Sequence, residues 1–272
     1  MPRKAKVFMA KAHFLRIGLV LAVWVLPLGH RCIAEDNTVL PLSVKAVKTD
    51  FGNFYWDRSN LTKLGIGIAG AAVFANTGMD RYIRNKYQDD LRSNATDDAT
   101  KPFNVSANAI TLVLAPAYLG AYGAGLWFDL PAMEEWAQKS FRATLVGTPT
   151  LLLLAAATGG DRPTEGDSNW GGFNNFHGVS GHAYFTAVPF ITAAKMSENT
   201  YWKAIFYGLS TLTGISRVND DKHYFSHVAL GWYIAYLSCA AVEKGDDRQE
   251  RRVSVQIAPV PKGIAMMAQK RF

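Results

Sequence analysis

The chain has 272 residues, of which 49% are hydrophobic and 19% are charged, and its formal net charge is +7. This length is enough to bury a sizeable core, and the composition lies between that of soluble proteins and that of polytopic membrane proteins. Much of the positive charge lies at the two ends of the chain, beside apolar runs, and no nucleic-acid recognition motif accompanies it. We therefore expect no nucleic-acid partner.

The N-terminus has the pattern of an export signal. Basic residues lead into an apolar run at 17–28, and residues 32–34 (Cys-Ile-Ala) offer a cleavage site for a signal peptidase. We interpret residues 1–34 as a signal peptide or, if it is retained, as an N-terminal anchor. Cleavage would leave Cys239 as the one remaining cysteine, so no disulfide framework is expected.

Residues 35–106 are expected to form an amphipathic and charged N-terminal region. The stretch 37–60 is mixed and aromatic, which suits an amphipathic helix that lies on a membrane or caps a bundle. A short apolar segment rich in glycine and alanine follows at 64–75. The stretch 81–101 carries charges of both signs and is predicted to be a solvated loop or an exposed helix.

Residues 107–245 are expected to form one helical domain, and residues 246–272 a C-terminal tail. The domain contains five apolar segments, at 108–128, 143–157, 183–196, 201–215 and 228–242. The first has about the length that a bilayer needs, whereas the last three are short for crossing one and suit buried helices equally well. The sequence therefore predicts an all-α fold, a single bundle of about six core helices.

Chemistry-bearing residues border these apolar segments in three short runs. The runs are Arg162-Pro163, then Ser180-Gly181-His182, then Ser216-Arg217 with His223 after five further residues. An arginine fork matches the oxygens of a phosphate and keeps its charge at any working pH. One histidine can attack phosphorus while another protonates the leaving oxygen. The loop and the turn that carry these runs are separated by two helices, so they lie on the same side of a membrane, which we expect to be the outer side.

The three runs, in this order, resemble the signature of the type 2 phosphatidic acid phosphatase and vanadium haloperoxidase superfamily. That signature reads Lys-x6-Arg-Pro, Pro-Ser-Gly-His and Ser-Arg-x5-His-x3-Asp, and the resemblance covers about residues 151–231. It implies a helical bundle, here the phosphatase-like domain 107–245, that hydrolyses phosphate monoesters or diphosphates through a phosphohistidine. It also implies that His223 is the nucleophile and His182 the general acid. The residues expected to bind the phosphate are Arg162, Ser180, Gly181 and Arg217.

Two positions depart from the signature. Ala155 stands where the signature has its lysine, and His227 stands where it has its final aspartate. That aspartate normally accepts a hydrogen bond from the nucleophilic imidazole and fixes its tautomer. A neutral His227 would be able to accept the same bond, so we count His227 with the catalytic residues and expect weaker activity, or activity shifted to higher pH.

Other interpretations remain open. His223 and His227 are spaced i, i+4, as in a zinc-binding pair, but no carboxylate lies between them, and we expect neither a metal nor another cofactor. The departures also allow a catalytically weak anion-binding or scaffold protein on the same fold, and the missing lysine argues against a vanadate-dependent peroxidase. We expect a phosphorylated lipid or small molecule as the substrate and a location in the cell envelope, in the membrane or the periplasm.

Overall fold

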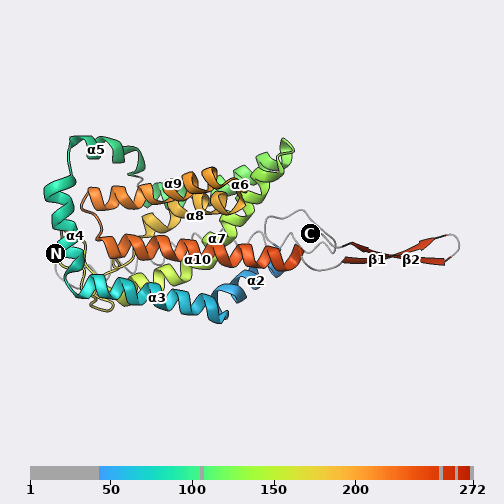
Figure 1. The fold of residues 1–272 in the computed structure, drawn as a ribbon, viewed down its shortest axis with the longest axis horizontal. Helices are drawn as coiled ribbons and strands as arrows, with labels where there is room; N and C mark the ends of the chain where they lie inside the picture. Colours follow the sequence, from blue (N-terminus) through green and yellow to red (C-terminus); the bar gives the residue numbers. More distant parts are fainter. Residues whose placement is uncertain (1–42, 105–106, 251–253, 261–262, 270–272) are drawn as a thin grey trace.

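A computed structural model describes residues 43–104, 107–250, 254–260 and 263–269 (Figure 1). The expected signal peptide or anchor, residues 1–34, lies outside these ranges. The described residues form a bundle of helices, followed by an antiparallel β-hairpin that Figure 1 shows beyond the end of the last helix. The prediction of an all-α fold is confirmed for the bundle, and the hairpin is an addition to it.

The elements follow one another with short connections, apart from one long loop. The N-terminal elements are α2 (Val44–Tyr55), α3 (Arg58–Asn76), α4 (Met79–Lys86), the π-helical turn η1 (Tyr87–Leu91), α5 (Asn94–Thr100) and the 3-10 turn η2 (Lys101–Phe103). The remaining helices are α6 (Ala107–Trp127), α7 (Pro131–Thr158), α8 (Gly181–Met196), α9 (Thr200–Asn219) and α10 (Phe225–Glu250). The strands β1 (Ser254–Val260) and β2 (Gly263–Gln269) pair with each other. The long loop, residues 159–180, joins α7 to α8.

Helix α10 lies at the centre of the bundle. It packs against α2, α3, α7, α8 and α9, so the N-terminal helices and the C-terminal helices share one core. The largest fully buried side chains of that core include Tyr184, Leu230, Ile234 and Leu237. Such an apolar core is the main favourable contribution to the stability of the fold.

Helix α7 begins twelve residues before the apolar segment that predicted it, at Pro131 instead of residue 143. Its first half carries charges, and one of them is buried: Arg142 forms a bidentate ion pair with Asp50 of α2, with N–O distances of 2.7 and 2.9 Å. Asp246 of α10 also accepts a hydrogen bond from Arg142. A buried charge is tolerated when it is paired in this way, so a charged helix face here is part of the interior.

Two of the described helices are long and apolar enough to cross a membrane. They are Pro131–Thr158 and Phe225–Asp247, and 61% of the apolar window of each is buried inside the bundle. The core helix of a soluble protein has the same length and composition, so these helices suggest membrane association only weakly.

Candidate active site

The three predicted runs meet at one end of the bundle, where Figure 1 shows α4 lying across the turn between α9 and α10. The backbone N–H of Ser180 donates to the carbonyl oxygen of His227 at 2.9 Å, which joins the start of α8 to the first turn of α10. The hydroxyl of Tyr224 donates to the carbonyl oxygen of Gly166 at 2.8 Å and joins the long loop to the same turn. Residues 47 and 58 positions apart in the sequence are thus held together by direct hydrogen bonds.

Arg162 lies in the long loop, and the loop is held at both sides. It leaves α7 through Gly159, whose φ of 59° is favourable for glycine at a helix C-terminus. Farther along, the Ser168 hydroxyl donates to the carbonyl of Ala75 and the Trp170 N–H donates to the side chain of Asn76, both at the end of α3. Such anchoring limits the conformations that Arg162 can adopt.

Ser180, Gly181 and His182 begin α8. The Ser180 hydroxyl accepts from the N–H of Ala183 at 3.4 Å, which is the geometry of a helix N-cap, and Ser180 is fully buried. Its backbone lies so close to α10 that a Cβ added to Gly231 would come within 2.4 Å of the Ser180 carbonyl oxygen. In this structure the Ser180 side chain caps the helix, and its contact with phosphate stays a prediction.

Arg217 and His223 lie on the last turn of α9 and on the connection to α10. The N–H groups of Lys222 and His223 both donate to the carbonyl oxygen of Arg217, at 2.9 and 3.2 Å. The turn passes through Asp221, whose φ is 54°. These bonds fold the connection back on the helix end, so that Arg217 and His223 share one tight loop.

Electrostatic effects place the cations and imidazoles of the three runs near one another. Burial lowers the pKa of His223 well below its usual value, and electrostatic interactions with His227, Arg162, His177 and His182 lower it further. Burial also lowers the pKa of Arg217; Asp220 acts in the opposite direction, and Arg162 adds to the lowering. Arg162 thus lies within electrostatic reach of both Arg217 and His223, and His182 lies within reach of His223.

Several polar atoms of this site are buried and lack a hydrogen-bond partner among the described residues. They are Arg162 Nε, Ser216 Oγ, Arg217 Nε, His223 Nδ1 and both ring nitrogens of His227. Within the residues that the structure describes, neither Arg162 nor Arg217 forms an ion pair with a carboxylate. Buried donors without partners are costly, and a bound anion would satisfy the arginine donors.

His227 is fully buried next to the expected nucleophile. Its ring meets the ring of His223 edge to face, with centroids 5.8 Å apart, and it also meets the ring of Tyr224 edge to face. Burial, with a smaller effect from His177, lowers the pKa of His227 to about 3, so its imidazole is neutral. No hydrogen bond joins the two rings, because His223 Nδ1 and both His227 nitrogens are among the atoms without partners. The other position that departs from the signature, Ala155, lies in the hydrophobic core.

The acidic residues near the site pair with groups other than its two arginines. Two arginines of α4 bind acids near the site: Arg81 pairs with Asp167, and Arg84 pairs with Asp221. Asp161 accepts from Asn175 within the long loop. Among the described residues, no group of three or more His, Cys, Asp or Glu side chains is arranged to hold a metal ion.

One contact of the site was not foreseen from the sequence. The guanidinium of Arg217 donates to the side-chain oxygen of Asn104 at 2.6 Å, and Asn104 lies directly after η2. The stretch 81–101, predicted to be a solvated loop or an exposed helix, forms short and largely exposed helices, and several of its residues also contact the α9–α10 turn. The mixed charges of this stretch did not indicate the packing, because the same residue types occur in solvated segments and in segments whose charges pair with distant residues.

Comparison with known proteins agrees with the geometry. Residues 131–249 match the family model of the PAP2 superfamily, and these residues contain all of the predicted catalytic and phosphate-binding positions. No curated protein and no solved structure matches the chain. The match over residues 131–249 supports membership of the PAP2 superfamily, the family that the three sequence runs had indicated.

Proposed function

We propose that this protein is a phosphatase that hydrolyses a phosphate monoester or diphosphate through a phosphohistidine on His223. The preferred substrate in this proposal is a lipid phosphate. The observation that carries the proposal is the convergence of two arginines without carboxylate partners on two imidazoles at one end of the bundle. A transferring phosphoryl group spreads negative charge over its equatorial oxygens, and fixed guanidinium groups stabilise that charge. Membership of the PAP2 superfamily supports a phosphatase activity.

The reaction proceeds in two steps. In the first, an imidazole nitrogen of His223 attacks phosphorus, the bond from phosphorus to the leaving oxygen breaks, and His182 gives that oxygen a proton. In the second, water attacks the phosphohistidine, His182 takes a proton from the water, and the P–N bond breaks to release inorganic phosphate. Arg162 and Arg217 hold the phosphoryl oxygens in both steps. The lowered pKa of His223 keeps its imidazole neutral, which the attack requires.

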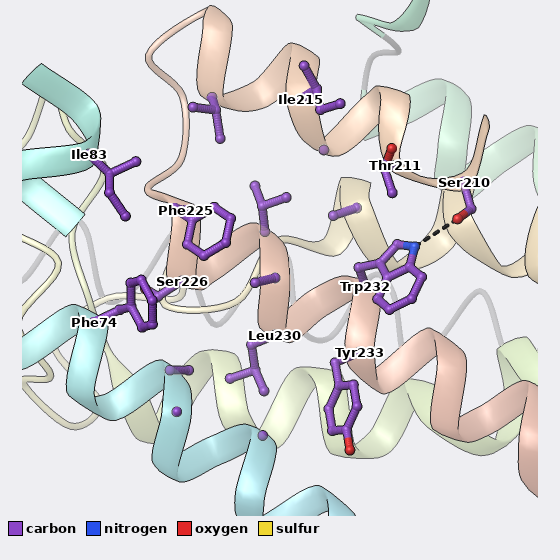
Figure 2. Close-up of a pocket in the computed structure, with 18 of the residues that line it drawn as sticks. Phe74, Ile83, Ser210, Thr211, Ile215, Phe225, Ser226, Leu230, Trp232 and Tyr233 are labelled. Atoms are coloured by element: carbon purple, nitrogen blue, oxygen red, sulfur yellow. Dashed lines mark hydrogen bonds between the residues drawn. The ribbon is translucent and has the colours of Figure 1, made fainter. Parts of the chain in front are cut away.

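A cavity beside the site supports a lipid substrate. It has a volume of about 600 Å³ and lies between α3, α4, α9 and α10 (Figure 2). Its lining is almost wholly apolar, because the few polar groups are engaged elsewhere: the Trp232 indole N–H donates to the Ser210 hydroxyl, and Ser226 donates to buried Asp80. Pockets of this size and character suit apolar ligands.

The cavity begins at the end of the bundle that holds the site. Phe225, two residues after the nucleophile, lines it together with Val218, the neighbour of Arg217. Figure 2 shows it running from Phe225 along α10 to Trp232, a length of about 10 Å at 1.5 Å per helical residue. The hydrocarbon chain of a lipid phosphate bound at the site would lie in this cavity, along α10. We propose that the protein acts in the cell envelope with the site on the outer side, a location that a lipid substrate would require and that the two apolar helices support weakly.

Hydrolysis assays test the proposal. Purified protein should release phosphate from p-nitrophenyl phosphate and from alkyl phosphates, retain activity in EDTA, and be inhibited by vanadate. His223→Ala should abolish turnover while circular dichroism shows a retained fold. For alkyl phosphates, kcat/KM should rise with chain length, and Ala229→Phe, which fills the cavity, should remove that dependence. Equal kcat/KM for short and long chains would refute the lipid part alone.

The two positions that depart from the signature favour a second function, which is phosphate binding without hydrolysis. His223 Nδ1 has no acceptor among the described residues, and the lysine position is a core alanine, so the site lacks two groups of a full phosphatase. A protein of this kind would bind phosphate without turning it over. Wild-type protein that binds inorganic phosphate but hydrolyses none of these substrates would support this scaffold function over the phosphatase.

A further inference from the structure

The segment 79–104, made of α4, η1, α5 and η2, lies outside the part of the chain that matches the PAP2 superfamily. It nevertheless contacts the turn that links Arg217 to His223. Figure 1 shows α4 and α5 at the end of the bundle where α9 and α10 are joined. A segment in this place has the opportunity to fix the relative positions of the phosphate-binding arginine and the nucleophile.

Each residue from 217 to 221 is bound by the segment. Tyr87 and Asp97 both bind the side chain of Asn219, and the Gln88 amide donates to the carbonyl oxygens of residues 218 and 219. Arg84 forms a bidentate ion pair with Asp221. The carbonyl groups at the end of a helix have no partner within the helix, so these bonds hold a part of α9 that would otherwise fray.

Asn104 contacts the site most directly. Its side-chain oxygen accepts from Arg217 Nη1 at 2.6 Å, and its side-chain nitrogen donates to Asp220 at 2.6 Å. The two partners define the orientation of the amide, because a flipped amide would present its N–H₂ to the guanidinium and its oxygen to the carboxylate. Asn104 is therefore a rigid bridge between two residues of one turn.

We propose that Asn104 is a positioning residue that holds the guanidinium of Arg217 toward the phosphate, with the segment 79–104 as its support. This inference rests on the proposed phosphate site but not on turnover at that site. A guanidinium has five N–H donors in a planar fork. With Nη1 bound to Asn104, the edge that carries the unpartnered Nε remains available to an anion.

An asparagine suits this role better than an acid would. Its neutral oxygen accepts one bond from Arg217 and leaves the positive charge uncompensated, whereas a carboxylate at the same place would neutralise the charge that binds the phosphate. The guanidinium also loses fewer conformations on binding when one of its nitrogens is already held. Preorganisation of this kind contributes both to affinity and to the rate of the chemical step.

The test measures the binding of inorganic phosphate by calorimetry and its inhibition of p-nitrophenyl phosphate hydrolysis. Asn104→Ala should weaken phosphate binding about tenfold, the effect expected for one hydrogen bond to a charged group, and should lower kcat as well as raise KM. Lys86→Ala is the matched control, because Lys86 lies in the same segment and pairs with Asp90 on its exposed surface. Affinity and kcat of Asn104→Ala equal to those of Lys86→Ala would overturn the proposal.

A double-mutant cycle separates positioning from general support of the fold. If Asn104 acts through Arg217, Asn104→Ala should have no further effect on phosphate affinity in an Arg217→Ala background. Additive losses would overturn the proposal in favour of a purely structural role. If Asn104→Ala does not fold, Asn104→Ser replaces it in each arm.

The proposed phosphatase activity and this inference fail separately. Wild-type protein that binds phosphate without turnover refutes the phosphatase, and the calorimetric comparison of Asn104→Ala with wild type still decides the inference. Wild-type protein that binds no phosphate refutes both.

Discussion

His227→Asp tests how the nucleophile is activated. The substitution places a carboxylate where the superfamily signature has one. In this structure, His223 Nδ1 is buried without an acceptor, and the neighbouring His227 is neutral and makes no hydrogen bond to it. A carboxylate would accept from Nδ1–H, fix the tautomer that leaves the other nitrogen free for attack, and stabilise the positive charge that forms on the ring.

The size of the effect follows from the distance between the rings. Two unit charges separated by the 5.8 Å between the His223 and His227 ring centroids interact by about 3 kcal/mol at an effective dielectric constant of about 20. An interaction of this size raises the pKa of His223 by about two units. Because burial and the nearby cations hold that pKa below its usual value, the rise makes the nucleophile more basic and brings it back toward the ordinary range. We expect kcat to increase about tenfold or more.

The assay is turnover of p-nitrophenyl phosphate at neutral pH. His227→Asn is the matched control, since it has the size and shape of aspartate without the charge, and it should give no increase. Both variants lose a buried ring, so both should be less stable by a few kcal/mol, which urea denaturation measures. A kcat for the aspartate variant at or below that of the asparagine variant, with both proteins folded, would refute the reasoning and would indicate that His227 has a role of its own.

Two further predictions follow from burial and packing. The acid limb of the pH profile of kcat/KM should lie below the ordinary imidazole pKa of about 6.5, because the free enzyme holds His223 neutral to lower pH; a limb at or above that value contradicts the neutral buried nucleophile. Gly231→Ala should lower the free energy of unfolding by about 1–3 kcal/mol, because its Cβ would overlap the carbonyl at the start of α8, and should reduce kcat. Gly208→Ala on α9, where a Cβ meets nothing within 4 Å, is the control and should be neutral or stabilising. Chemical denaturation that ranks the two variants in the opposite order contradicts the close packing of α8 on α10.

The apolar segments predicted the helices of the bundle but not their ends. α8 and α9 begin within two residues of their apolar segments, since both are bounded by side chains that cap helices, Ser180 and Asn199. α7 extends twelve residues before its apolar segment, because its first half carries charged residues such as Arg142, which is buried with its partner Asp50. Hydrophobicity along the chain does not show which charges find a partner far away in the sequence.

Two of the predicted site residues make contacts in three dimensions that differ from their expected roles. Ser180 caps α8 with the hydroxyl that was expected to reach the phosphate. The ring of His227 lies next to that of His223, although His223 precedes α10, and the two rings meet edge to face without a hydrogen bond. An i, i+4 spacing places two residues on one helix face only where both lie in the helix, and the orientation of their rings depends on the neighbours that pack around them.

The sequence by itself determined the helical class and the order of the segments, and it predicted the residues that would carry phosphate chemistry, because periodic hydrophobicity and short motifs are local properties of the chain. Only the tertiary structure decided that the segment 79–104 contacts the α9–α10 turn, that the arginines lack carboxylate partners among the described residues, and that an apolar cavity lies between α3, α4, α9 and α10. These features arise from contacts between residues up to 137 positions apart in the sequence. Such contacts depend on how the helices pack around α10, and no local pattern in the chain records that packing.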